Sequence, residues 1–469
     1  MREIETDYLV VGAGVSGMAF VDSLIAESDA EVVVVDRRHR PGGHWLDAYP
    51  FVRLHGPSAT YGVNSRVLGN DRIDETGPNA GFYERATGAE ICAYFDRVLN
   101  EDLIPSGRVR FFGMCDYQGA DSEGHHLVSL LTGAETTVKV RRKLVDATYV
   151  ESSIPSRHTP TFAVEPGVRV IPPNDLVELH DAAVGFTVIG AGKTAMDTCN
   201  WLLDAGVDAD SIQWIRPRDP WMLNRAFGQP LELVGSHMEL QARWVEAAAE
   251  ALDGRDFARR LEAFGLFLRI DPSVEPDTFR GATISTTELD SLRAIERVVR
   301  NGRVLRIVSN SIVMEGGSAT TVPGEIYIDC TAAGVRPTTA RPIFTTGRII
   351  LQYVTIGMVP WSAATVGVVE AFGDADAEKN RLCNPVVFTG DAADLLQLSY
   401  AGMLGILARG AEPDLAAWAE RSRLNPSKGA SGHLDDPRVP AAFESLGANI
   451  GAAMTNLEGR TSEPVSLPT

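Results

Sequence analysis

The stretch Tyr8–Gly17 constrains the fold of this chain more than any other part of it. Its nearly continuous apolar run, Tyr-Leu-Val-Val, is typical of a central parallel strand that is covered on both faces. Gly12, Gly14 and Gly17 then allow a tight turn, the approach of backbone N–H groups to a diphosphate, and close packing of the next helix. We therefore predict a dinucleotide-binding strand, turn and helix here.

An acidic residue follows at the spacing that such a unit requires. A second apolar strand ends at Asp36, nineteen residues beyond Gly17. A carboxylate at this place can accept hydrogen bonds from the hydroxyls of an adenosine ribose. The basic run that begins at Arg37 comes directly afterwards, and we predict that Arg37 contacts the cofactor, although a solvated turn explains this run as well.

A second glycine turn occurs in the middle of the chain. The apolar strand 185–189 leads into Gly190-Ala191-Gly192-Lys193-Thr194-Ala195, and a helix and another strand follow at 196–205 and 212–215. This pattern predicts a second dinucleotide site. Its expected contacts are Gly190, Gly192, Lys193, Thr194 and Ala195. Lys193 suits a phosphate or nicotinamide contact, and an exposed position fits it equally well.

The two turns differ at the ribose position. Trp214 stands where the first copy has its acid, and Arg216 and Arg218 follow at the strand end. A guanidinium pairs with a 2′-phosphate, whereas a carboxylate repels it, so the second site is predicted to take NADPH rather than NADH. The alternative is that both arginines form a solvated strand end.

Composition excludes several classes of partner. The 469 residues carry a formal charge of −19, which disfavours binding to nucleic acid or to anionic lipid. No apolar run reaches membrane-spanning length, and the charged start of the chain leaves no room for a signal peptide, so we expect a cytoplasmic protein. The five cysteines are scattered without a CxxC pair, which predicts neither a redox disulfide nor a metal site.

The segment after Asp36 resembles a known family. Gly42-Gly43-His44-Trp45, followed by the loop 54–62, is similar to the FAD-binding half of the class B flavoprotein monooxygenases, the flavin-containing and Baeyer–Villiger enzymes. The resemblance implies that the first site holds FAD. The residues that it assigns to FAD are Gly12, Gly14, Gly17, Asp36, Gly43, His44 and Trp45. It makes His55 a candidate flavin neighbour, while a structural loop histidine is an equal alternative.

The resemblance also implies the arrangement of the chain. We expect an α/β protein with two Rossmann-like domains, the NADPH domain being inserted in the FAD domain. Its expected segments are 1–175 for the first part of the FAD domain, 176–330 for the NADPH domain with a helical insertion at about 230–300, 331–425 for the second part of the FAD domain, and 426–469 for a C-terminal wrap or tail. A helix opening within 357–364 is expected to point its N-terminus at the flavin.

The implied activity is an NADPH-dependent monooxygenation. NADPH would reduce FAD, and O2 would form a C4a-peroxyflavin that transfers one oxygen atom to nitrogen, sulfur or a ketone of a small organic substrate. The region around Phe162 lacks the histidine and tryptophan of the family fingerprint, and Tyr149 replaces a glycine. The missing fingerprint favours the alternative of an NADPH-dependent flavoprotein reductase, whereas Tyr149 is expected to change the backbone path or the stacking around it. A non-catalytic nucleotide-binding regulator and a homodimeric assembly also stay open.

Overall fold

The strand that opens the chain is central to the first sheet. In the computed structural model, which describes residues 2–336 and 338–461, β1 lies between β2 and β6 and pairs parallel with both. Tyr8, Leu9 and Val10 are at most 1% exposed, as expected for a strand covered on both faces. The order is β19-β20-β6-β1-β2-β3, and the hairpin β4 and β5 extends from β6. The strands are β1 (Arg2–Val11), β2 (Val32–Val35), β3 (Val109–Phe112), β4 (Cys115–Asp121), β5 (Gly124–Ser129), β6 (Glu135–Asp146), β19 (Phe344–Thr345) and β20 (Arg348–Ile350).

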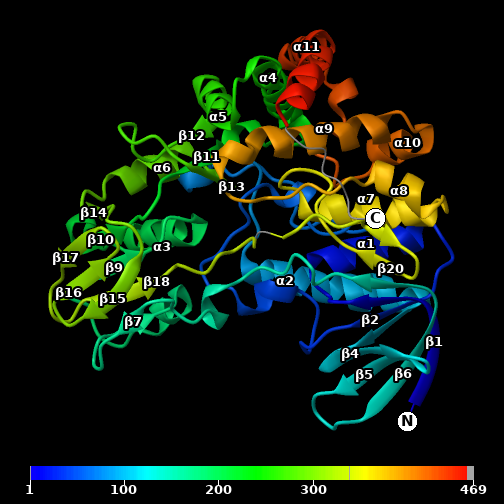
Figure 1. Cartoon of the computed structure of the whole chain (residues 1–469), viewed down its shortest axis with the longest axis horizontal. Helices are drawn as coiled ribbons and strands as arrows, with labels where there is room; N and C mark the ends of the chain where they lie inside the picture. Colours follow the sequence, from blue (N-terminus) through cyan, green and yellow to red (C-terminus); the bar gives the residue numbers. More distant parts are fainter. Residues whose placement is uncertain (1, 337, 462–469) are drawn as a thin grey trace.

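The second glycine turn belongs to a separate parallel sheet with the order β14-β10-β9-β18-β8. All of its strands lie in the chain between β6 and β19, so the second unit is inserted within the first. Figure 1 shows the two units side by side. The predicted fold class, α/β with two Rossmann-like units of which one is inserted, is therefore confirmed. The strands are β8 (Val170–Ile171), β9 (Phe186–Ile189), β10 (Ile212–Ile215), β14 (Val298–Val299) and β18 (Ile326–Asp329).

The chain enters the second unit earlier than residue 176, where we had placed the boundary. β8 pairs with β18, and β7 (Ala163–Val164) pairs with β15 in the sheet β17-β16-β15-β7. These two-residue strands are too short to show a period in the sequence, which explains the late boundary. The other strands of this small sheet are β15 (Val304–Val308), β16 (Ser311–Met314) and β17 (Gly317–Thr320).

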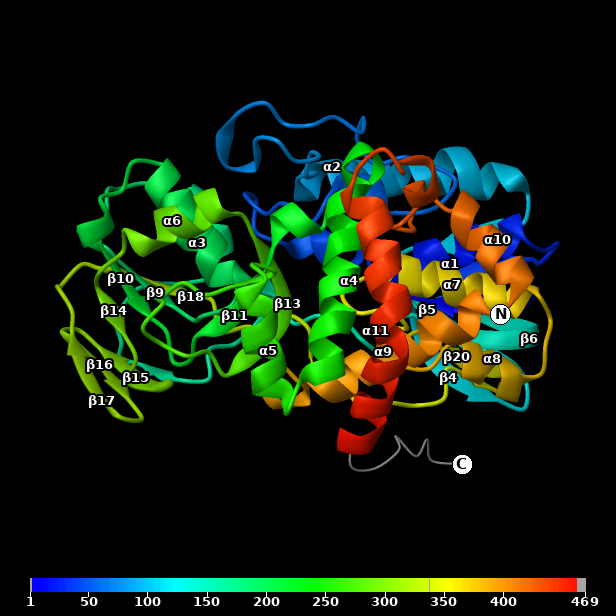
Figure 2. The ribbon, with the colours of Figure 1, turned by 90° about the horizontal axis from the view of Figure 1, so that it is seen from above.

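A helical layer covers the junction of the two units. It combines α4 (Val234–Glu250) and α5 (Gly254–Ala263) of the expected insertion with α9 (Leu395–Gly410) and α11 (Arg438–Arg460), and Figure 2 shows α4 and α11 running alongside each other. A three-stranded sheet lies below this helical layer in the view of Figure 1. Its strands are β11 (Pro220–Asn224), β12 (Phe267–Leu268) and β13 (Thr278–Ile284).

The C-terminal segment differs from the expected wrap or tail. Most of it is the helix α11, which packs on α4 through buried side chains that include Val439, Ala442, Ala453 and Leu457. Alanine is only weakly apolar, so the alanines of this helix give a weak periodic signal in the sequence. The sequence therefore did not indicate that this face packs closely on another helix. Residues 462–469 of the expected tail lie outside the described residues.

The remaining helices cover the two sheets. α1 and α7 pack together closely, since a Cβ added at Gly367 would lie 2.7 Å from the carbonyl oxygen of Phe20. Among the described residues, no helix combines the length and the apolar character needed to cross a bilayer. The bounds are α1 (Val15–Ala26), α2 (Gly88–Arg97), α3 (Lys193–Asp204), α6 (Thr286–Arg293), α7 (Val359–Ala371), α8 (Asp376–Leu382) and α10 (Pro413–Arg421).

Candidate functional site

Both glycine turns line one cavity of about 1290 Å³. Its wall contains Gly12 and Gly14 from the first unit, Gly190 and Gly192 from the second, and residues of the helical layer. Single-ligand pockets have volumes of roughly 300–1,000 Å³. The cavity is therefore large enough to receive more than one ligand, and the two turns face the same space.

The first turn is built by close contacts between backbones. Gly12 has φ +106°, and a side chain at Gly17 would overlap the carbonyl oxygen of Gly12. Gly43 approaches so closely that a Cβ on it would lie 2.8 Å from the Cα of Gly14. Helix α1 begins after Gly14 without a side-chain cap, so its first N–H groups are free to bind an anion.

Asp36 closes the first site. Its carboxylate is 7% exposed and accepts hydrogen bonds from the N–H groups of Ala13 (2.7 Å) and Arg38 (2.8 Å) at the cavity wall. Arg37 does not line the cavity, because its exposed side chain pairs with Asp116 at 3.3 Å. The neighbouring Arg38 lines the cavity instead, so the structure does not bring Arg37 to the predicted site.

His44 and Trp45 line the same part of the cavity, as expected for the residues after the glycine pair. Trp45 donates from Nε1 to the hydroxyl of Tyr61 at 2.7 Å, which fixes the indole plane. Burial, with a further contribution from the charge of Arg38, lowers the pKa of His44 to about 4. His44 is thus a neutral group at neutral pH.

The second turn crosses the end of β18. Gly190 has φ +131°, and a Cβ on it would lie 2.7 Å from the carbonyl oxygen of Cys330. Helix α3 begins after Gly192, again without a side-chain cap. Thr194 lines the cavity, whereas Ala195 is fully buried and packs the helix against the sheet. Four of the five predicted contacts, Gly190, Gly192, Lys193 and Thr194, therefore reach the cavity.

The two predicted arginines have different positions. Arg216 is 2% exposed, lies over the ring of Trp214 and pairs with Asp219 at 3.3 Å, so it does not line the cavity. Arg218 does line it, together with Arg280 and Arg303. The prediction for Arg216 is therefore wrong. The indole of Trp214 and the carboxylate of Asp219 draw this guanidinium into the protein.

Arg218, Arg280 and Arg303 form a basic wall. Burial lowers the pKa of Arg280, and the positive charges of Arg218 and Arg303 lower it further, which places the three cations close together. None of them forms an ion pair with a carboxylate in the described part of the chain. Unpaired like charges at a cavity wall attract an anion, although solvent screens Arg218 and Arg303, which are exposed.

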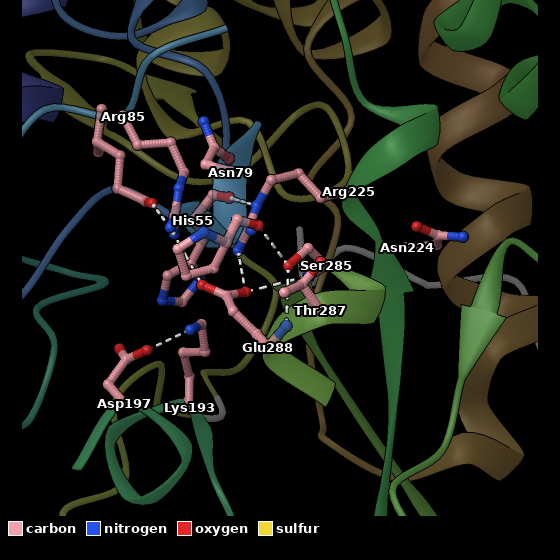
Figure 3. Close-up of polar contacts among 12 residues, drawn as sticks. His55, Asn79, Arg85, Lys193, Asp197, Asn224, Arg225, Ser285, Thr287 and Glu288 are labelled. Atoms are coloured by element: carbon pink, nitrogen blue, oxygen red, sulfur yellow. Dashed lines mark hydrogen bonds and ion pairs between the residues drawn. The ribbon is translucent and has the colours of Figure 1, made fainter. Parts of the chain in front are cut away.

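His55 faces the cavity next to a buried ionic cluster (Figure 3). Glu288 accepts from Arg225 at 2.7 Å and from Arg85 at 3.1 Å. The same arginines donate to the loop that carries the histidine, Arg225 to the carbonyl of His55 (3.1 Å) and Arg85 to that of Leu54 (3.2 Å). The cluster thereby fixes the backbone that presents His55.

The charges of the cluster set the protonation states within it. Burial alone would raise the pKa of Glu288, but Lys193, Arg225 and Arg85 together lower it to about 2. Burial lowers the pKa of His55 to about 4, and the positive charge of Lys193 acts in the same direction. Near neutral pH the site therefore combines a fixed carboxylate with a neutral imidazole.

Lys193 links the second turn to the first unit. Its ammonium pairs with Asp197 on the next turn of α3, and Asp197 also accepts from the hydroxyl of Tyr49 at 2.7 Å. Lys193 is 9% exposed and lines the cavity, so the structure favours the contact position over the exposed one.

Sequence reasoning missed Arg85, Arg225, Glu288, Arg280 and Arg303. These residues lie far apart in the chain. Only folding brings Arg225, Arg280 and Arg303 to the cavity wall and joins Arg85 and Glu288 to Arg225 in the ionic cluster. The sole local signal was the capping box Ser285 to Glu288, which predicts a helix start rather than an ionic cluster.

Comparison with known proteins supports the fold and the family. Residues 10–67 match the family model described as an NAD(P)-binding Rossmann-like domain. Uncharacterized protein Rv2000 of Mycobacterium tuberculosis and uncharacterized protein Mb2023 of Mycobacterium bovis are each 45% identical over 425 residues, which covers 90% of this chain and 78% of theirs. A solved structure of oxidized steroid monooxygenase bound to NADP superposes with a TM-score of 0.50 at 14% identity, covering 78% of this chain and 85% of that one.

Proposed function

Because the chain belongs to the family of the mycobacterial protein Rv2000 and has the class B flavoprotein monooxygenase fold, we propose that it is an FAD- and NADPH-dependent monooxygenase. The observation that carries the proposal is the single cavity lined by both glycine turns. Two dinucleotides bound there would have their reactive rings in one enclosed space. Such a space suits hydride transfer between them.

The first site fits FAD. The close approach of Gly14 and Gly43 leaves room only for backbone beside the start of α1, and the uncapped N–H groups there suit a diphosphate. Asp36 presents a buried carboxylate to the ribose, and Trp45 offers a fixed aromatic face. The first turn of α7, at Val359 and Pro360, also lines the cavity, so its helix dipole would stabilise negative charge on a reduced ring.

The second site fits NADPH. The uncapped start of α3 suits the diphosphate, and the basic wall of Arg218, Arg280 and Arg303 suits a 2′-phosphate. Lys193 lies between this turn and His55 and has its charge partly balanced by Asp197. NADPH selection in this proposal depends on Arg218 and two arginines outside the glycine motif rather than on Arg216.

The residues of the chain would shield and orient the reaction. Flavin supplies hydride acceptance and activation of O2 when it is bound, chemistry that no amino-acid side chain provides. The apolar side of the helical layer, with Leu240, Trp244 and Met403 at the cavity wall, would exclude water and receive a small organic substrate. His55 would act as a neutral hydrogen-bonding group whose backbone is held in place by the ionic cluster.

Rapid mixing of NADPH-reduced protein with O2 tests this proposal. We expect purified protein to be yellow, to be reduced by NADPH, and to form a flavin–oxygen adduct that persists for seconds before oxidised flavin returns. Direct return without an adduct would establish the reductase alternative instead. Protein that stays colourless and cannot be reconstituted with FAD would rule out both enzymes and favour the nucleotide-binding regulator.

A further inference from the structure

One polar cluster interrupts the apolar wall of the cavity. His237 and Gln241 lie one turn apart on α4, and Ser427 comes from the segment before α11. All three line the cavity, where their neighbours on α4 include Leu240 and Trp244. A polar group on an otherwise apolar pocket wall usually fixes the orientation of a ligand.

The hydrogen bonds of the cluster define what it offers to a ligand. Gln241 donates from Nε2 to His237 Nε2 at 2.8 Å and to Ser427 Oγ at 2.7 Å. Because Nε2 of His237 accepts, the imidazole proton is on Nδ1. Nδ1 and the Gln241 carbonyl oxygen have no partner among the described residues, and neither is sealed from solvent. The cluster thus presents the N–H of His237 as a donor and the carbonyl oxygen of Gln241 as an acceptor, and the hydroxyl hydrogen of Ser427 is a second donor.

The cluster is preorganised and carries no charge. His237 is 6% exposed, and burial lowers its pKa to about 4, so the imidazole is neutral near neutral pH. Gln241 is held by two hydrogen bonds, so ligand binding costs little further ordering of its side chain. By contrast, the nearby Trp244 has its indole N–H satisfied by Ser399 at 3.1 Å and offers nothing to a ligand.

We propose that His237, Gln241 and Ser427 form the subsite that anchors the substrate, and that the substrate is an apolar molecule bearing one neutral hydroxyl or carboxamide. Such a group accepts from His237 Nδ1 and donates to the carbonyl oxygen of Gln241, while Ser427 holds the amide in place. A carboxylate or an ammonium is disfavoured, since it would be desolvated at this cluster without a counter-charge. The inference rests on the proposed function for the reaction, but the binding that it predicts is independent of turnover.

A pair of matched probes tests the subsite. para-Methylthiobenzamide and para-methylthiotoluene carry the same oxidisable sulfur and differ in whether the far end is a carboxamide or a methyl group. Calorimetric titration of FAD-loaded protein without NADPH should show about tenfold tighter binding of the carboxamide, the value expected for two net hydrogen bonds. Equal affinity of the wild-type protein for both probes would overturn the proposal.

Substitutions then locate the preference. His237→Phe and Gln241→Leu should each reduce the preference for the carboxamide severalfold and leave the affinity for the toluene within about twofold, which also shows that the variant is folded. The exposed residues His180 and Gln118 offer matched controls, His180→Phe and Gln118→Leu, which should keep the full preference. If the preference for the carboxamide persists in both cavity variants, another part of the cavity wall causes it and the proposed subsite is wrong.

The two proposals fail in different ways. A carboxamide preference without sulfoxide formation would support the subsite and contradict the proposed monooxygenase activity. Sulfoxide formation from both probes with equal affinity would support the monooxygenase and overturn the subsite.

Discussion

The two glycine turns have nearly the same sequence pattern, but their surroundings differ. In the first, Gly17 packs against Gly12, and Gly43 packs against Gly14, so backbone meets backbone on both sides. In the second, Ala195 takes the place of the third glycine, and a Cβ at Gly192 would meet nothing within 4 Å. The first turn is therefore enclosed on both sides, whereas the second is closely packed at Gly190 and open at Gly192.

The charges around the turns differ in the same sense. Asp36 is a single buried acid held by two backbone N–H groups, whereas the second site has the basic wall, whose arginines come from three separate segments. A tight site with a fixed acid suits a cofactor that stays bound. A less enclosed site lined by cations suits one that enters and leaves in each cycle. Three predictions test this difference, beginning with the largest effect, and a fourth concerns the buried histidines around the cavity.

Exchange of the third residue should destabilise the first turn much more than the second. Gly17→Ala places a methyl group on the carbonyl oxygen of Gly12, so we expect the free energy of unfolding to fall by about 3 kcal/mol or more and FAD to be lost. Ala195→Gly adds backbone freedom and removes one buried methyl group, and should cost about 1–2 kcal/mol. Urea unfolding and flavin content measure both. A Gly17→Ala protein that retains FAD and full stability would contradict the tight packing of the first turn.

Removal of the basic wall should affect only the second cofactor. Arg218→Ala is expected to raise KM for NADPH by about 10- to 100-fold and to leave KM for NADH unchanged, because the arginine would bind the 2′-phosphate. Arg216→Ala is the control. It should lower stability by breaking the buried contact with Asp219 without altering the ratio of the two KM values. A change in that ratio for Arg216→Ala alone would restore the prediction made from sequence.

Neutralising the acid should affect only the first cofactor. Asp36→Asn keeps the size of the side chain but weakens its bonds to the ribose and to the N–H of Ala13, so we expect roughly tenfold weaker FAD binding. Equilibrium dialysis of apoprotein measures the affinity, and Arg218→Ala should leave it unaltered. Equal weakening by both substitutions would show that the two sites do not act separately.

Mild acid should reduce stability slightly. His44, His55 and His237 each have a pKa near 4 instead of the usual 6.5, because burial disfavours their charged forms. The unfolded chain therefore binds more protons than the folded one below about pH 6.5, and stability falls from there towards pH 4. Each histidine should contribute less than about 1 kcal/mol to the loss between pH 7 and pH 6.

Replacement identifies the source of that pH dependence. His237→Gln should flatten the decline of the free energy of unfolding with falling pH, as measured by urea titration at several pH values. A slope equal to that of the wild-type protein would show that His237 is protonated equally in the folded and unfolded states.

Local pattern predicted much of the site. The strands around both turns and Asp36 were predicted from spacing, because each forms within a few residues of its neighbours in the chain. The Gly43-His44-Trp45 segment was predicted from the family resemblance. The errors concern side-chain direction. Arg37 and Arg216 turn away from the cavity and pair with Asp116 and Asp219. Arg38 and Arg218, which lie close to them in the chain, line the cavity.

The sequence by itself determined two strand, turn and helix units, the acid of the first and the absence of an acid in the second, because these depend on backbone periods and glycine conformation. Only the tertiary structure decided which cations reach the cavity, that Glu288 joins Arg85 to Arg225 behind His55, and that α11 completes the layer over α4. Such contacts join residues far apart in the chain, and their energies depend on burial and charge partners, which no local pattern contains.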